Sequence, residues 1–425
     1  MPFVFADPFS NRADRRARSF RGARVGALMG LVLPALVVAG AGTGCRRNEP
    51  QQAAQVPPPP TARPDHPVPE APVEIVSAAA EEGPGLSAEE RASLPGLIAF
   101  VREIDHRKVP HVVRPDGSGL RALPSPHGLD AVVMAASRDG RYLAGVAAAG
   151  EGEEHVEQLV LWTLPELTLR EVGPKSRRAR HPVFSPDGTK LAFESGHERF
   201  SNLYVAELSK GGEATGAVTV RRVTDAEAGD FEPSWSSDGA WLTFASSREG
   251  DPEIFRVRAD GSELQRLTAF HREDVSPRWS PTGAQIAFLS DRAGDDALYL
   301  MAADGTGQRR VGPEGAAREH VWSPDGSRLA LAVKAQGGRA RVATVEAKDG
   351  RVTLLTGGDA VEDMPAFSPD GRHLVFVSDR GGLPRLYLIR ADGTGRTPLF
   401  APSGSAGASH DWLPLWFDAA RAPKE

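Results

Sequence analysis

Residues 276–311 read SPRWSPTGAQIAFLSDRAGDDALYLMAADGTGQRRV, and this stretch decides the fold. It predicts short strands at 277–280, 285–290, 298–302 and 308–311. The chain turns at Pro281-Thr282-Gly283 and again at Asp304-Gly305, where glycine is free to adopt a positive φ angle. The unit is therefore one four-stranded antiparallel meander.

The same unit recurs along the chain, and repeats of this kind define the architecture. Its marker is a Ser-Pro-Asp-Gly-like tetrapeptide, whose glycines are 48, 51, 44, 43 and 45 residues apart. The copies are Ser137-Arg138-Asp139-Gly140, Ser185-Pro186-Asp187-Gly188, Ser236-Ser237-Asp238-Gly239, Ser280-Pro281-Thr282-Gly283, Ser323-Pro324-Asp325-Gly326 and Ser368-Pro369-Asp370-Gly371. Four-stranded units at this spacing are typical of the blades of a β-propeller.

The strand compositions indicate how the meanders pack. The second strands read LAFES, LTFAS, IAFLS, LALAV and LVFVS, which are nearly continuous apolar runs. A strand this apolar is covered on both faces, as it would be in a ring of radially packed sheets. The fourth strands, such as Gln308 to Val311, are charged, and charge at an outer edge discourages edge-to-edge association.

The number of blades follows from the two ends of the repeat region. An apolar second strand occurs seven times, and the first copy, Leu97 to Val101, has no first strand before it. The missing strand is found at His410 to Phe417, where Pro414 and Trp416 match Pro277 and Trp279. We therefore expect an all-β propeller of seven blades, closed by the C-terminal strand. Six blades is the alternative, because residues 130–173 match the repeat weakly.

The repeats resemble the PD40 repeats of the TolB family. The resemblance rests on Phe367-Ser368-Pro369-Asp370-Gly371, Ser378-Asp379-Arg380-Gly381-Gly382 and Ala391-Asp392-Gly393-Thr394-Gly395, and it covers residues 95–418. WD40 repeats have a similar period, but no Trp-Asp dipeptide occurs in the sequence. The resemblance implies a protein-binding or scaffold module. The additional amino-terminal α/β domain of TolB has no counterpart in this sequence.

The amino-terminal residues have the features of an export signal. Six arginines precede an apolar run at Val25 to Gly42, and Gly42-Thr43-Gly44-Cys45 resembles a bacterial lipobox. We expect residues 1–44 to be a signal peptide and Cys45 to carry lipid, which places the protein at the periplasmic side of a bacterial cell envelope. A transmembrane anchor and an ordinary secreted protein are the alternatives.

A proline-rich segment, residues 45–94, begins at the predicted lipidation site, Cys45. Proline fixes φ and lacks an N–H group, so this segment is predicted to be an extended linker without sheet. A short helix is expected at Ser87 to Ala92, with Ser87 as its cap and Glu90 in the capping-box position. Residues 419–425 are a tail.

Charge excludes nucleic acid as a partner. After residue 44 the chain has 44 basic and 54 acidic side chains, whereas a protein that neutralises phosphates needs a basic surface. We expect a monomer that binds an envelope protein or peptide, a basic segment being one candidate, and that reaches the membrane through its lipid anchor.

Acidic residues precede each inner strand and are the predicted binding site. By the geometry of a propeller they gather near one end of the central channel, where they would attract a basic segment or a cation. The candidates are Asp230, Glu232, Glu273, Asp274, Glu319, Glu362, Asp363 and Asp411. The alternative interpretation is a solvated rim whose acids cap backbone N–H groups.

The sequence lacks the usual catalytic signatures. It has no G-x-S-x-G elbow, no H-E-x-x-H and no phosphate-binding loop, so we expect no enzyme activity, no cofactor and no metal. The alternative function is a channel-mouth enzyme such as a propeller-fold polysaccharide lyase. It would use the histidines at the blade entries, His181, His271, His320 and His410.

Overall fold

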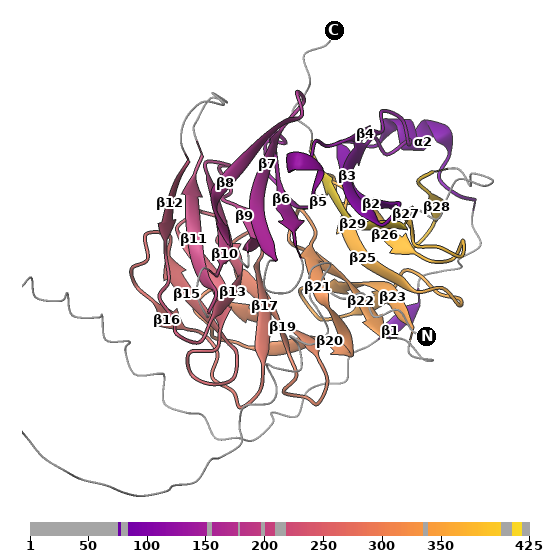
Figure 1. Ribbon diagram of the computed structural model, residues 1–425. Coiled ribbons are helices and arrows are strands. Elements are labelled where there is room, and N and C mark those ends of the chain that lie inside the picture. The colour runs from indigo at the N-terminus through magenta and orange to yellow at the C-terminus, as the bar shows by residue number, and fades with distance from the viewer. Residues whose placement is uncertain are drawn as a thin grey trace, which may run out of the picture. The chain divides into compact units, whose positions relative to one another are not determined.

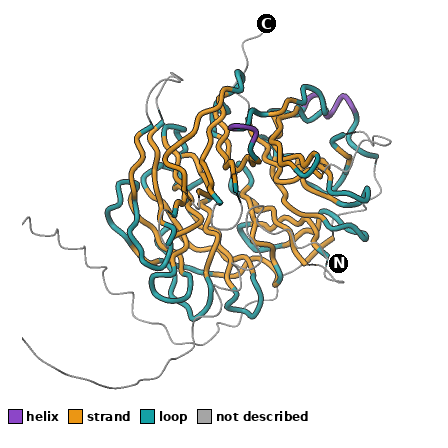
Figure 2. Tube along the Cα trace, in the orientation of Figure 1, coloured by secondary structure: helices purple, strands orange, loops and turns teal. Residues whose placement is uncertain are grey.

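The computed structural model describes residues 75–77, 84–150, 155–176, 179–196, 200–208, 218–334, 339–400 and 410–418. Its strands form seven small antiparallel sheets arranged in a ring, which confirms the predicted seven-bladed β-propeller (Figure 1). The six-bladed alternative is wrong, because residues 130–176 form a complete sheet of their own. Apart from two short helical segments, the described chain consists of strands joined by loops and turns (Figure 2).

Each blade is a meander whose first strand lies at the axis of the ring. Blade 1 contains β29 (His410–Phe417), β2 (Leu97–Ile104), β3 (Arg107–Val113) and β4 (Arg121–Ala122). Blade 2 contains β5 (Asp130–Ala136), β6 (Tyr142–Ala149), β7 (Val156–Thr163) and β8 (Thr168–Ser176). Blade 3 contains β9 (Ala179–Phe184), β10 (Lys190–Ser195), β11 (Asn202–Glu207) and β12 (Thr219–Arg222).

The remaining blades repeat the same order. Blade 4 contains β13 (Asp230–Trp235), β14 (Trp241–Ser246), β15 (Glu253–Arg258) and β16 (Gln265–Arg266). Blade 5 contains β17 (Asp274–Trp279), β18 (Gln285–Ser290), β19 (Ala297–Ala302) and β20 (Arg309–Glu314). Blade 6 contains β21 (Ala316–Trp322), β22 (Arg328–Lys334), β23 (Ala340–Glu346) and β24 (Val352–Leu354), and blade 7 contains β25 (Glu362–Phe367), β26 (His373–Ser378), β27 (Arg385–Arg390) and β28 (Thr397–Pro398).

The core lies between neighbouring blades, as the apolar second strands predict. In β18 every residue after Gln285 is buried, and β14 and β26 are buried in the same way. The side chains of β18 and β19 pack with those of β22 and β23 in one cluster, so a single core joins blades 5 and 6. Burial on both faces explains why these strands do not alternate between apolar and polar residues.

The repeated tetrapeptide forms the turn between the first and second strands. In blade 6, Ser323 Oγ donates to Asp325 Oδ1 at 2.6 Å, and the Gly326 N–H donates to the Ser323 carbonyl at 2.9 Å. Gly326 has a φ of 72°, a conformation that a side chain would strain. The hydroxyl of Ser185 makes the same bond to Asp187 and lowers the pKa of this carboxyl to about 2. These aspartates are therefore part of the turn.

The C-terminal strand closes the ring, as predicted. β29 pairs antiparallel with β2, and Leu97 lies opposite Phe417. Asp411 accepts two hydrogen bonds from the Arg102 guanidinium, at 2.7 and 3.0 Å, and the Trp416 indole donates to the Pro95 carbonyl at 2.8 Å. The two ends of the propeller sequence are thus held within one sheet.

The segment before the propeller contains more structure than the proline content suggested. The expected helix is present as α2 (Ala88–Ser93), and the Glu90 N–H donates to Ser87 Oγ at 3.0 Å. The expectation of no sheet was wrong for β1 (Ile75–Ser77), which pairs in parallel with β24 at the edge of blade 6. Residues 75–77 contain no proline, so their N–H groups are free to pair. A short 3₁₀ turn, η1 (Pro126–Gly128), completes the ordered elements.

No helix in the described ranges is both long enough and apolar enough to cross a bilayer. The predicted signal peptide, Cys45 and the tail at 419–425 lie outside the described residues.

Candidate functional site

The seven inner strands run in the same direction along the axis, because each four-stranded meander returns the chain to its starting sense. Their first residues therefore meet at one end of the ring, and the Ser-Pro-Asp-Gly turns that follow them meet at the other. We call these ends the acid mouth and the turn mouth. The acid mouth holds the eight predicted carboxylates.

Four of these eight carboxylates are inaccessible. Asp230, Asp274, Glu362 and Asp411 have no exposed surface. In blade 4, Arg248 Nη2 donates to both oxygens of Asp230 at 3.0 Å, while its Nε donates to Ser246 Oγ at 2.8 Å. The arginine thus fastens the loop after the second strand to the start of the first strand.

The same pairing of an arginine with the acid at the start of the first strand recurs in other blades. In blade 5, Arg292 donates to Asp274 at 2.7 Å and to Ser290 Oγ at 2.9 Å. In blade 7, Glu362 accepts from Arg380 at 3.4 Å. The prediction that all eight carboxylates face solvent or a partner was therefore wrong for these four. The Ser-x-Arg sequence at the end of the second strand is the signal that could have identified Asp230, Asp274 and Glu362 as members of structural ion pairs.

The other four predicted carboxylates are more accessible. Glu319 is exposed, and Glu232, Glu273 and Asp363 are half-buried. Burial raises the pKa of Asp363, whose carboxylate accepts the N–H of Met364 at 2.7 Å. The four come from blades 4 to 7, so they occupy one side of the ring.

Bulges in the inner strands bring a second set of side chains to the axis. At these bulges the residue before the strand's proline takes a positive φ, from 49 to 57°. This residue is polar on blades 3 to 5 and apolar on blades 7 and 1. The polar residues are His181, Glu232 and Ser276, and the apolar ones are Met364 and Leu413. A positive φ is unusual for residues with a side chain and is often found at functional positions. This inner row is polar on one side of the ring and apolar on the other.

The polar bulge residues connect neighbouring blades. Glu232 Oε2 accepts from the N–H of Ser276 at 2.8 Å and from its hydroxyl at 3.0 Å. The N–H of Glu232 donates to Glu194 at 3.3 Å, and His181 Nδ1 lies 3.3 Å from the same carboxylate. Burial alone would lower the pKa of His181, but Glu194 and Glu232 outweigh it and raise this pKa. The resulting arrangement is an imidazole ring flanked by two carboxylates.

The four candidate histidines do not form a metal site. No group of three or more His, Cys, Asp or Glu side chains in the described part of the chain could hold an ion. His271 is exposed before β17, and His410 begins β29. His320 is buried where other inner strands have proline, and burial together with Arg278 lowers its pKa to about 3. The imidazole of His320 is therefore neutral at neutral pH.

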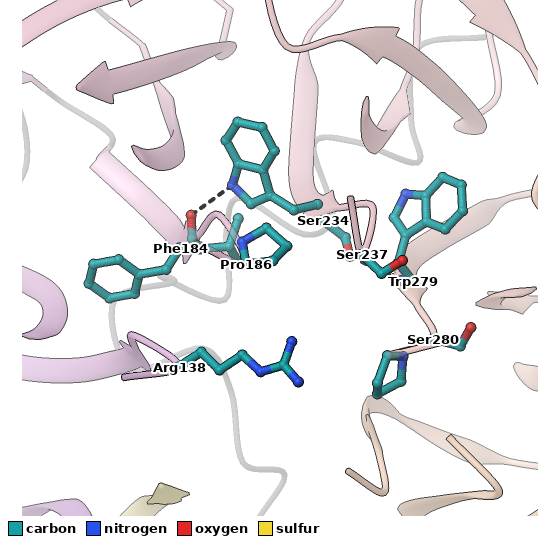
Figure 3. Close-up of a pocket in the computed structure, with 10 residues that line it drawn as sticks. Arg138, Phe184, Pro186, Ser234, Ser237, Trp279 and Ser280 are labelled. Carbon is teal, nitrogen blue, oxygen red and sulfur yellow. Dashed lines mark hydrogen bonds between the residues drawn. The ribbon is translucent and has the colours of Figure 1, made fainter. Parts of the chain in front are cut away.

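The turn mouth carries a hollow of about 230 Å³ that sequence analysis did not predict (Figure 3). Its wall includes Arg138, Phe184, Pro186, Ser237, Trp279 and Pro281, from blades 2 to 5. Figure 3 shows the Arg138 guanidinium pointing into the space between Phe184 and Ser280. The signal was present in the repeats, because Arg138 and Ser237 replace the proline of the tetrapeptide.

Comparison with known proteins agrees with the repeat pattern and the closed ring. The TolB beta propeller domain, PD40, matches residues 89–274 and 263–415. The chain belongs to this family. This TolB-like propeller is 32% identical to the Tol-Pal system protein TolB of Syntrophus aciditrophicus over 131 residues. The aligned residues cover 31% of this chain and 26% of that protein.

Two enzymes also resemble the TolB-like propeller. The uncharacterized peptidase YuxL of Bacillus subtilis is 30% identical over 206 residues, 47% of this chain and 29% of that protein. The chain therefore covers less than a third of the length of either curated relative. The structure of an oligogalacturonate lyase from Vibrio parahaemolyticus matches with a TM-score of 0.53 at 14% identity, over 74% of this chain and 89% of that chain, which shows a shared fold.

Proposed function

We propose that the protein is a binding module of the bacterial cell envelope, tethered to the membrane by lipid on Cys45, with no enzymatic activity of its own. The protein acts as a monomer. Its partner is a protein or peptide with a basic segment, which binds at the acid mouth. The observation that supports this function best is the acid mouth, where the carboxylates of Glu232, Glu319 and Asp363 come from three blades of a TolB-type propeller.

Electrostatics favours a basic partner. The predicted mature chain has 54 acidic and 44 basic side chains, and the buried carboxylates of the acid mouth are already matched by arginines. The accessible carboxylates at the same mouth add to the local negative potential, which is strengthened near a low-dielectric wall. Binding of this kind weakens as salt rises, because exposed charges are screened over about 10 Å at 0.1 M.

A defined peptide tests the binding site. Fluorescein-labelled hexalysine is titrated with the mature protein, and with Glu319→Gln and Asp363→Asn variants, at several salt concentrations. We expect binding that weakens with salt and that each substitution reduces. Glu171→Gln is the matched control, because Glu171 is exposed on β8 at the outer edge of blade 2. If the variant that combines Glu319→Gln with Asp363→Asn bound hexalysine as tightly as the control does, the site would lie elsewhere.

The tether is tested separately. Cells grown with a clickable fatty acid should label the wild-type protein and leave the Cys45→Ala variant unlabelled, since Cys45 is the one cysteine in the chain. If the Cys45→Ala variant takes up label, or if the wild type takes up none, the lipid anchor is contradicted. Neither outcome changes the conclusion from the peptide-binding experiment.

Enzyme activity is the competing outcome. Purified protein incubated with polygalacturonate should release no unsaturated product. Release of product that is lost in a His181→Ala or His410→Ala variant would replace the binding module with a lyase.

A further inference from the structure

The hollow at the turn mouth lies at the opposite end of the ring from the proposed binding site, and its chemistry is different. Of the six tetrapeptide turns, two replace the proline by a residue whose side chain donates hydrogen bonds, Arg138 in blade 2 and Ser237 in blade 4. Both replacements line this hollow. Two of the retained prolines, Pro186 and Pro281, line it as well, so cationic and apolar groups face the same space.

The turn itself does not require these replacements. Proline suits the second position of such a turn because its φ is already fixed, and a more flexible residue there costs about 0.4–1 kcal/mol. The N–H of Arg138 makes no hydrogen bond among the described residues, so the fold does not need a donor at that position. A proline at this position packs on the next blade. Pro186 of blade 3 lies close to Gly239 of blade 4, since a Cβ added to this glycine would be 3.6 Å from the proline ring. Arg138 instead extends over the hollow (Figure 3).

The charge of the wall favours an anion. Arg138 is exposed, and no ion pair of its guanidinium occurs within the described ranges. The lining residues include no acid. The nearby turn aspartates are occupied within their own turns: Asp139 accepts from Ser137 Oγ at 2.6 Å and from the Arg141 N–H at 3.1 Å. Arg141 also lies 3.7 Å from Asp139 and balances its charge, so Arg138 is left for a ligand.

The indole of Trp279 distinguishes this wall of the hollow from the equivalent place in other blades. In blades 4 and 6, Trp235 and Trp322 donate their indole N–H to a backbone carbonyl of the preceding blade, at 3.0 and 3.1 Å. The equivalent acceptor for Trp279 is the carbonyl of Ser234, but that oxygen accepts from the Thr243 hydroxyl at 3.3 Å. The Trp279 N–H is buried without a partner in the described structure, at the wall of the hollow. A buried donor without an acceptor is costly, but this N–H has no exposed surface, so it reports on the wall of the hollow and does not itself contact a ligand.

We propose that the turn mouth binds a carboxylate attached to a small apolar group. Arg138 pairs with the carboxylate, the Ser237 hydroxyl donates to it, and Pro186, Pro281 and Phe184 contact the apolar part. A volume of about 230 Å³ is below the range of about 300–1,000 Å³ that drug-sized ligands occupy, so the site fits one residue or an acid of similar size. The C-terminal residue of a polypeptide and a free small organic acid share this chemistry.

The experiment uses the mature protein labelled with ¹⁵N at its tryptophan indoles. The Trp279 resonance is assigned with Trp279→Phe, and the protein is titrated at constant ionic strength with phenylacetate and with acetyl-Gly-Gly-Phe. Each acid is matched by its neutral amide. We expect the acid to shift the Trp279 resonance and the amide to leave it unchanged. A response to the peptide alone identifies a polypeptide C-terminus, and a response to both probes identifies a general carboxylate site.

Variants locate the site. Arg138→Gln should bind about tenfold more weakly, the loss expected for one charge-assisted hydrogen-bonded pair. Arg138→Pro restores the tetrapeptide, so it should abolish binding while the melting temperature stays the same or rises. Arg372→Gln, an exposed arginine on the blade 7 turn, is the control for net charge at the same end of the ring. No shift with either acid, equal shifts with the amides, or unchanged binding by Arg138→Gln would overturn the assignment, whatever the result at the acid mouth.

Discussion

Replacing Arg102 by methionine should destabilise the propeller at its point of closure. The Arg102 guanidinium makes two hydrogen bonds to Asp411, whose side chain is completely buried between β2 and β29. Removing one partner of a buried pair leaves an uncompensated charge and typically costs about 3–5 kcal/mol. Arg385 lies 4.0 Å from the same carboxylate and compensates for part of the loss, so we expect about 3 kcal/mol. That is a large fraction of the 5–15 kcal/mol that stabilises most domains.

Equilibrium urea unfolding, followed by tryptophan fluorescence, measures this loss. The Arg102→Met/Asp411→Asn double variant should recover part of it, because the buried charge is removed together with its partner. Arg372→Met is the control, since Arg372 is exposed and its replacement should change the free energy of unfolding by less than about 0.5 kcal/mol. If Arg102→Met were as stable as this control, the Arg102–Asp411 pair would not contribute to closure.

Three further predictions concern the same framework. Burial and the neighbouring Asp274 raise the pKa of Glu253 from 4.5 to about 7, so the wild type should lose up to about 3 kcal/mol as pH rises through this interval. Glu253→Gln should lack this slope when urea midpoints at pH 4.5 and 7.5 are compared. Truncation after Gly407 removes β29 and leaves β2 unpaired, so melting curves should show a sharp loss of stability or the protein should become insoluble. Glu90→Ala breaks the 2.6 Å ion pair with Arg390 that holds α2 on blade 7; both groups are partly exposed, so urea unfolding should show a loss of only about 0.5–1 kcal/mol.

The blade architecture could be predicted because each determinant is local. The tetrapeptide defines a turn, the apolar run after it defines a strand covered on both faces, and the interval between copies defines a blade. Closure could also be predicted, since Pro414 and Trp416 repeat a pattern found in the other inner strands. The helix α2 followed from the Ser87 cap in the same way.

The candidate site could be predicted only in outline. The sequence placed the acids near one mouth, but which of them face solvent depends on side chains that meet across a sheet. Asp274 is buried because Arg292, 18 residues later, folds back onto it. The strand β1 was missed because a three-residue segment has no periodic pattern, and its pairing with β24 is decided by an edge almost 300 residues away.

Differences between repeats separate the residues that build the ring from those that give it function. A feature shared by most blades, such as the Ser–Asp hydrogen bond in the turns of blades 2, 3, 4, 6 and 7, serves the blade itself. A feature found in a single blade has no such structural requirement, and Arg138 occupies a position where proline serves the turn at least as well. The polar bulges of blades 3 to 5 are departures of the same kind, since Met364 and Leu413 satisfy the same backbone geometry with apolar side chains. In a ring whose backbone is nearly symmetric, these departures distinguish one ligand from another, and they are concentrated on blades 2 to 5.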